Sequence, residues 1–209
     1  MQSTPDAAHA SGDDDAAPFD TGDDATTKTT TGSPDGSTGP VGAEDAGANL
    51  SDAGVVLGED GATVEDFSAQ ASDFVCLKDW TQVNNYRIVN KLGHMSEALA
   101  VANSPDGGVF PVGTIISLIP GEASVKRGAG YSAATHDWEF FTLNASASGT
   151  TITAQGTAAV SNALGTCISC HGQAAPQWDL VCGDTHGCPS LILNGSQIAT
   201  AQQTDPRCP

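Results

Sequence analysis

From residue 67 onward, apolar and polar positions alternate in several short stretches, which is the pattern of half-buried strands. In residues 137–143, Trp138 and Phe140 fall on one face of a strand. Phe141 and Leu143 fall on the other face. Similar patterns predict strands at residues 112–119 and 150–156, weaker strands at 97–102 and 124–127, and short helices at 166–173 and 196–203. We expect an α+β fold, mainly an antiparallel β-sheet domain with short helices.

Residues 1–66 show no apolar period, and their only aromatic residue is Phe19. They hold 15 acidic groups and one basic group, Lys28, which is a net charge of −14. Such a segment buries too little apolar area to offset the entropy of ordering its backbone. We therefore predict a disordered acidic low-complexity tether over 1–66 and a folded domain over 67–209. An acidic tail that docks a basic partner is the alternative.

The charge balance of the whole chain excludes some classes of partner. Seven basic and 25 acidic side chains give a formal charge of −18. A nucleic-acid surface is built on lysine and arginine, so we expect no nucleic-acid partner. Binding to anionic membranes is disfavoured for the same reason.

The motif that carries chemistry is Cys167-Ile168-Ser169-Cys170-His171, a C-x-x-C-H sequence of the kind that attaches c-type haem. On a helical turn, the two sulfurs can form thioethers with the two haem vinyl groups. The histidine of the same turn can then bind the iron as its proximal ligand. We predict one covalent haem c held by Cys167 and Cys170, with His171 as the iron ligand.

Two other interpretations of this motif were weighed. A thioredoxin-type C-x-x-C is expected in a βαβ context, which the pattern does not show. A structural zinc site requires a second ligand pair, and the nearest candidates, Cys182, His186 and Cys188, have poor spacing for zinc. Neither gives a role to the histidine that directly follows the second cysteine.

The remaining cysteines are Cys76, Cys182, Cys188 and Cys208, an even set with three possible pairings. Cys182 and Cys188 flank a short glycine-containing loop, whereas Cys76 and Cys208 flank the expected domain. We predict disulfides between Cys182 and Cys188 and between Cys76 and Cys208. Disulfides and c-type haem attachment both predict a periplasmic or cell-surface protein. No signal peptide is visible at residues 1–5, so a membrane tether through a missing N-terminal segment stays open.

Three blocks follow one another over residues 80–182. They are Phe110-Pro111-Val112-Gly113-Thr114, Val125-Lys126-Arg127-Gly128-Ala129-Gly130-Tyr131 with Asp137-Trp138, and the C-x-x-C-H motif followed by Ala174 and Asp179. Together they resemble the cytochrome P-460 family, which includes the cytochrome c′-beta proteins. The resemblance implies a small, mainly antiparallel β domain with one haem held by a C-terminal helix. It also implies that a homodimer is possible.

The sequence departs from this family at one important position. In cytochrome P-460 itself, a lysine after the Gly-Thr pair is covalently linked to the haem and accompanies hydroxylamine oxidation. Leu118 occupies the matching position here. An arginine expected near residues 97–100 is also absent. Lys126 is the remaining candidate for a crosslink, although a lysine beside Arg127 more often meets solvent or a haem propionate.

The sixth iron ligand stays open among Met95, His94, His136, His186 and none. Methionine on the iron favours an electron carrier, whereas an empty position favours a gas binder. Our first hypothesis is an extracytoplasmic monohaem cytochrome that transfers single electrons to a redox partner protein. The alternatives are a five-coordinate haem protein that binds nitric oxide or a similar small diatomic ligand, and an oxidase of hydroxylamine or another small nitrogen compound. We lean against an enzyme, because we expect an apolar distal pocket without a proton acceptor.

Overall fold

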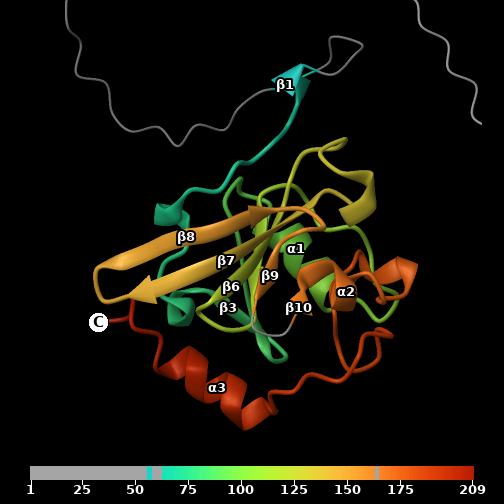
Figure 1. Ribbon diagram of the computed structural model, residues 1–209. Coiled ribbons are helices and arrows are strands. Elements are labelled where there is room, and N and C mark those ends of the chain that lie inside the picture. Colours follow the sequence, from blue (N-terminus) through green and yellow to red (C-terminus); the bar gives the residue numbers. More distant parts are fainter. Residues whose placement is uncertain (1–55, 58–62, 163–164) are drawn as a thin grey trace, which may run out of the picture. The chain divides into compact units, whose positions relative to one another are not determined.

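The computed structural model describes residues 56–57, 63–162 and 165–209 (Figure 1). The chain divides into two compact units, Met1–Gly47 and Ala48–Pro209, and every described residue belongs to the second. Most of the tether expected over residues 1–66 lies outside the described residues. The strands are β1 (Val56–Leu57), β2 (Thr63–Val64), β3 (Thr81–Val83), β4 (Tyr86–Asn90), β5 (Thr114–Ser117), β6 (Glu122–Lys126), β7 (Trp138–Ser146), β8 (Gly149–Gly156), β9 (Ser161–Asn162) and β10 (Gly165–Thr166). The helices are α1 (Met95–Ala102), α2 (Cys167–His171) and α3 (Gly195–Gln203), with 3₁₀-helices η1 (Ala71–Asp73), η2 (Leu77–Asp79), η3 (Ala133–Thr135) and η4 (Pro176–Trp178).

Strands β3 to β8 form one antiparallel sheet of six strands, in which each strand pairs with its neighbour in sequence. Two short hairpins, β1–β2 and β9–β10, stand apart from this sheet. Neighbouring antiparallel strands can be joined by a short turn, as between β3 and β4 or β7 and β8, whereas the connection from β4 to β5 contains α1. The expectation of a mainly antiparallel sheet with short helices is confirmed.

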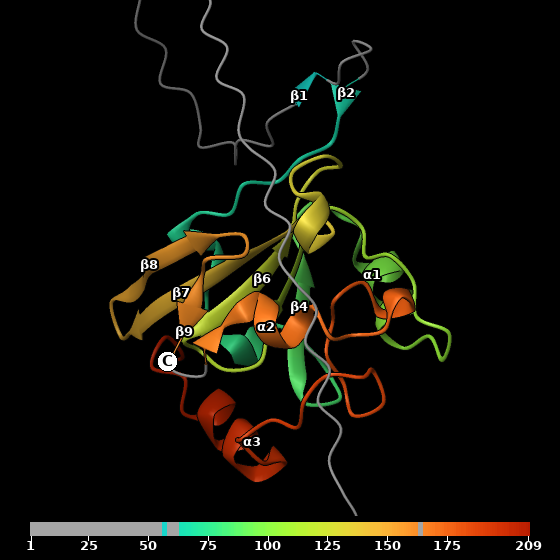
Figure 2. The same ribbon diagram turned by 45° about the vertical axis from the view of Figure 1, so that its right-hand side comes forward.

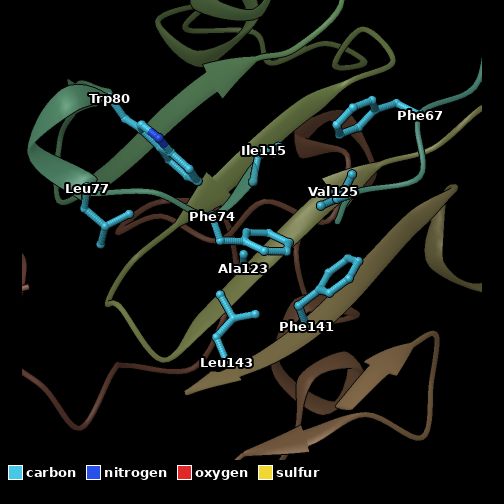
Figure 3. Close-up of a cluster of buried hydrophobic side chains, with 10 residues drawn as sticks. Phe67, Phe74, Leu77, Trp80, Ile115, Ala123, Val125, Phe141 and Leu143 are labelled. Carbon is cyan, nitrogen blue, oxygen red and sulfur yellow. The ribbon is translucent and has the colours of Figure 1, made fainter. Parts of the chain in front are cut away.

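One face of the sheet packs against the segment that precedes it (Figure 3). Ile115 and Val125 from the middle strands lie there with Phe141 and Leu143 of β7. The chain before β3 covers this face with four large side chains, Phe67, Phe74, Leu77 and Trp80. This half of the core therefore needs no ligand to be complete.

The opposite face carries the alternate residues of the same strands, because side chains point in turn to the two faces of a sheet. Trp138 and Phe140 of β7 and Ile88 of β4 are buried on it, as the alternation in residues 137–143 predicts. Side chains of α1 and α2 pack against this cluster. Figure 2 shows α2 in front of the sheet. The C-x-x-C-H motif is thereby positioned on this second face.

Most other elements form where the pattern predicts them. Strands expected at 112–119, 124–127, 137–143 and 150–156 correspond to β5, β6, β7 and β8, and the two expected helices to α2 and α3. The strand expected at 97–102 is wrong, because these residues belong to α1. Alanine, leucine and glutamate dominate this segment and are strong helix formers. Its fully buried Ala98 anchors the helix on the sheet.

Both predicted disulfides are present, Cys76 with Cys208 and Cys182 with Cys188. Disulfides persist mainly in oxidising compartments, so they indicate an extracytoplasmic environment. Within the described ranges, no helix is both long enough and apolar enough to cross a membrane.

Candidate functional site

The C-x-x-C-H residues form the short helix α2 directly after the β9–β10 hairpin. The backbone N–H of Cys167 donates to the carbonyl of Val160 at 2.9 Å, and the Ser169 hydroxyl donates to the carbonyl of Thr166 at 2.6 Å. The first backbone N–H groups of a helix have no partner within the helix, so bonds such as these satisfy polar groups at its start. Cys167 and Cys170 are free thiols and both are partly buried.

Cys167, Cys170 and His171 all line one pocket with a volume of about 730 Å³. Apolar residues of the second sheet face form one wall of it, among them Ile116 and Phe140. Other walls come from the loop of the Cys182–Cys188 disulfide, from the residues that follow it and from α3, including Pro189, Leu191, Leu193 and Ile198. Tyr86 at the start of β4, Leu118 after β5 and Val181 before the loop also line the pocket. This volume lies within the range of sites that hold cofactors and other small molecules.

The imidazole of His171 is held by its own neighbourhood. Its Nδ1 lies 2.7 Å from the carbonyl oxygen of Leu180, and its ring centroid lies 5.1 Å from that of Phe140. A carbonyl only accepts hydrogen bonds, so Nδ1 carries the proton and Nε2 keeps its lone pair. Burial lowers the pKa of His171, and the bond to Leu180 opposes this shift only in part. The neutral tautomer that results is the one that can bind a metal through Nε2.

The protonation of Cys167 argues against thiol–disulfide chemistry. Burial raises the pKa of the Cys167 thiol to about 11, with a further contribution from the negative charge of Glu122. A redox-active C-x-x-C requires the opposite shift, since the thiolate is the nucleophile. The alternative zinc site also loses its second pair, because Cys182 and Cys188 are joined in a disulfide.

Glu122, at the start of β6, was not predicted as a site residue and lines the same pocket. Burial raises its pKa, while a hydrogen bond of 2.6 Å from the Asn162 amide to Oε2 acts in the opposite direction. The expectation of a pocket without a proton acceptor is therefore wrong. Side chains alternate along β6, so Glu122 and Ser124 face the pocket together. A predicted strand that began at Glu122 instead of Ser124 would have placed Glu122 on the same face.

Three of the four proposed sixth ligands are not among the described residues that line the pocket. His94 lies 2.8 Å from the carboxylate of Glu97 and 3.2 Å from that of Glu65. Met95 begins α1 and packs beside the second apolar cluster. His136 is partly exposed, in the loop before β7.

His186 is the exception, because it lines the pocket from within the Cys182–Cys188 loop. Its ring stacks on Trp178 with centroids 3.8 Å apart, and its Nδ1 donates to the carbonyl of Val181 at 2.7 Å. These two contacts fix its ring in place beside the pocket.

Lys126 does not face solvent, which is one of the two positions expected for it. It is buried, and its Nζ lies 2.7 Å from the carboxylate of Asp179. Neither residue is among the described side chains that line the pocket, whereas Leu118 is. Removing one partner of such a buried pair costs about 3–5 kcal/mol, since it leaves a charge without compensation.

Comparisons with protein-family models, with curated proteins and with solved structures found no match to this chain.

Proposed function

We propose that this chain binds one haem covalently through Cys167 and Cys170, with His171 as an axial ligand of the iron, and that it transfers single electrons. The observation that carries this proposal is that all three side chains line one pocket. The hydrogen bond of 2.7 Å from Nδ1 of His171 to Leu180 adds to it, because it leaves Nε2 free to bind iron.

The other residues of the pocket fit a haem as well. The thiols of Cys167 and Cys170 are free, as thioether formation with vinyl groups requires. The apolar wall of Ile116, Leu118 and Phe140 suits the porphyrin face. When bound, the haem iron supplies a reversible one-electron change of oxidation state. The protein's part is to hold this group in place and to keep water from it.

The disulfides support export of this protein, and c-type haem attachment in bacteria occurs outside the cytoplasm. We therefore propose a periplasmic or cell-surface location, with a redox protein as the partner. The order of the sequence blocks supports membership of the cytochrome P-460 family. Dimer formation, a known tendency in that family, belongs to the same proposal.

Binding of a neutral diatomic ligand such as nitric oxide is the second candidate function. The observation in its favour is that, of the four candidate sixth ligands, only His186 lines the pocket among the described residues, and its ring is held by Trp178 and Val181. An iron without a protein-derived sixth ligand is open to small molecules. Hydroxylamine oxidation is less favoured, because Leu118 on the pocket wall supplies no crosslinking amine.

The proposal is tested by producing the full chain in a bacterial periplasm together with the c-type haem maturation proteins. We expect a purified protein with a c-type absorption spectrum and a redox titration that fits one electron. A Cys167→Ala/Cys170→Ala variant should lack covalent haem, whereas Cys182→Ala/Cys188→Ala should retain it. A colourless unaltered protein would refute haem binding. Addition of nitric oxide to the ferrous protein separates the two functions, since an immediate spectral change favours the ligand binder.

A further inference from the structure

A buried ion pair between Lys126 and Asp179 adjoins Leu180, whose carbonyl contacts His171. The ammonium of Lys126 donates to both carboxylate oxygens of Asp179, at 2.7 and 2.9 Å, and to the carbonyl of His136 at 2.7 Å. The two side chains are only 6% and 3% exposed. All three donors of the ammonium face acceptors, so the charge is fully compensated.

Asp179 is fixed by further contacts at both its side chain and its backbone. Its carboxylate also accepts the backbone N–H of Phe110 at 2.9 Å. Its backbone carbonyl accepts the indole N–H of Trp138 at 2.6 Å. Trp138 is itself 1% exposed and packed in the second apolar cluster. Strands β6 and β7 together hold Asp179 in one position.

The backbone at this point has an unfavourable conformation. Asp179 has a φ of 49° and Leu180 a φ of 59°, so two consecutive residues with side chains occupy the left-handed region. Such residues rarely adopt it, because the Cβ atom crowds the backbone. Strain of this kind persists only where the surroundings enforce it. With the backbone in this left-handed conformation, the carbonyl oxygen of Leu180 lies 2.7 Å from Nδ1 of His171.

We propose that Lys126 and Asp179 are positioning residues for His171. Their ion pair maintains the left-handed turn that holds the Leu180 carbonyl on Nδ1. This fixes the tautomer, the ring direction and the donor strength of Nε2 toward the haem iron. The inference rests on the haem function proposed above and adds a means by which the chain sets its reduction potential.

The direction of the effect follows from the hydrogen bond. A strong bond from Nδ1 to a carbonyl makes the imidazole a better electron donor, which stabilises the oxidised iron. Loss of the ion pair loosens this bond and favours the reduced iron. The midpoint potential should therefore rise when the Asp179 charge is removed, because the loosened bond and the lost negative charge act in the same direction. When the Lys126 charge is removed, the unpaired Asp179 carboxylate opposes this rise, so the Nδ1 proton of His171 is the readout there.

Three variants of the full-length holoprotein test this inference. Asp179→Asn keeps the shape of the side chain, Lys126→Met keeps the apolar stem, and Trp138→Phe removes the indole donor together with part of a buried ring. We expect a higher midpoint potential in Asp179→Asn and a smaller rise in Trp138→Phe. By NMR, the Nδ1 proton of His171 should exchange with solvent at least about tenfold faster. Asp66→Asn is the matched control, because it breaks an ion pair of 2.7 Å with Arg127 that does not involve Asp179.

Variants that carry covalent haem with an unchanged potential and unchanged proton exchange would overturn the inference, while the haem proposal would stand. An equal shift in Asp66→Asn would also overturn it, since any lost ion pair would then suffice. If the two charge variants do not fold, Trp138→Phe decides alone. Absence of covalent haem from the unaltered protein would defeat the haem proposal and this inference with it.

Discussion

The disulfide between Cys76 and Cys208 should contribute a large share of the stability of the domain. It joins residues 132 positions apart in sequence. The loop-closure relation for unfolded chains gives about 5 kcal/mol for a closed loop of this length at 25 °C. The free energy of unfolding of a whole domain is about 5–15 kcal/mol. A Cys76→Ala/Cys208→Ala variant should therefore be close to the limit of stability.

The native contacts around this disulfide do not depend on it entirely. A carboxylate oxygen of Asp205 accepts the backbone N–H of Leu77 at 2.9 Å, and the guanidinium of Arg207 donates to the carbonyl of Phe74 at 3.1 Å. The variant should keep these bonds, so its native fold is expected to persist at low temperature. Most of the loss then comes from the greater freedom of the unfolded chain.

Urea unfolding of the haem-free chain, followed by circular dichroism, measures this loss. The control is the Cys182→Ala/Cys188→Ala variant, whose disulfide spans only 6 positions. The same relation gives about 2 kcal/mol for it. We expect the first variant to lose more than the second. Equal losses, or a loss below about 1 kcal/mol in the first, would refute the argument from loop length.

Three further predictions follow from the pocket and the turns. Burial raises the pKa of Glu122, so the folded state loses stability as the pH rises above about 4.3, the ordinary glutamate value. In urea unfolding at pH 7, Glu122→Gln should therefore be more stable than the unaltered chain. A less stable variant would contradict this. Because Leu118 on the pocket wall carries no amine that could crosslink a haem, steady-state assays with hydroxylamine and an electron acceptor should show no turnover above a haem-free blank. A Cβ at Gly107, where φ is +76°, would lie 2.1 Å from the Gln177 carbonyl, so Gly107→Ala should lower the free energy of unfolding by at least about 2 kcal/mol. Gly130 has a φ of +90° but open space around it, so Gly130→Ala should lower it by only about 1 kcal/mol in the same assay.

The parts of the fold that could be predicted were those that a short stretch of sequence encodes by itself. The two faces of β7 were visible because Trp138 and Phe140 alternate with Phe141 and Leu143, and the structure separates them into the two apolar clusters. The disulfides could be predicted because one pair closes a short loop and the other brackets the domain.

The β3–β4 hairpin was not predicted, although a signal for it exists. Val83 pairs with Tyr86 across the two-residue turn Asn84-Asn85, and Asn84 has a φ of 48°. Asparagine tolerates this conformation, so two asparagines between β-formers indicate a hairpin. The helix α1 was missed for a different reason. Its residues Met95, Ala98, Leu99 and Ala102 follow the helical i, i+3, i+4, i+7 spacing, but two further apolar residues at 100 and 101 obscure this pattern.

The candidate site depends more strongly on the tertiary fold. Lys126 and Asp179 are 53 positions apart, and no local pattern pairs them. Glu122 enters the pocket only because β6 pairs with β7 in a particular register, Glu122 opposite Thr142. The motif residues Cys167 to His171 were evident from sequence because covalent haem attachment requires them at adjacent positions. The groups that tune them are set by long-range packing, which sequence spacing does not reveal.

The most direct test of the central proposal is the intact mass of the denatured full-length protein, after production with c-type haem maturation and extraction with acid acetone. Covalent attachment predicts a mass equal to the chain with two disulfides plus one haem, unchanged by the extraction. The Cys167→Ala/Cys170→Ala variant should have the mass of its polypeptide alone. If the unaltered protein has the mass of the bare polypeptide, haem is not attached at Cys167 and Cys170, and the proposed function is contradicted.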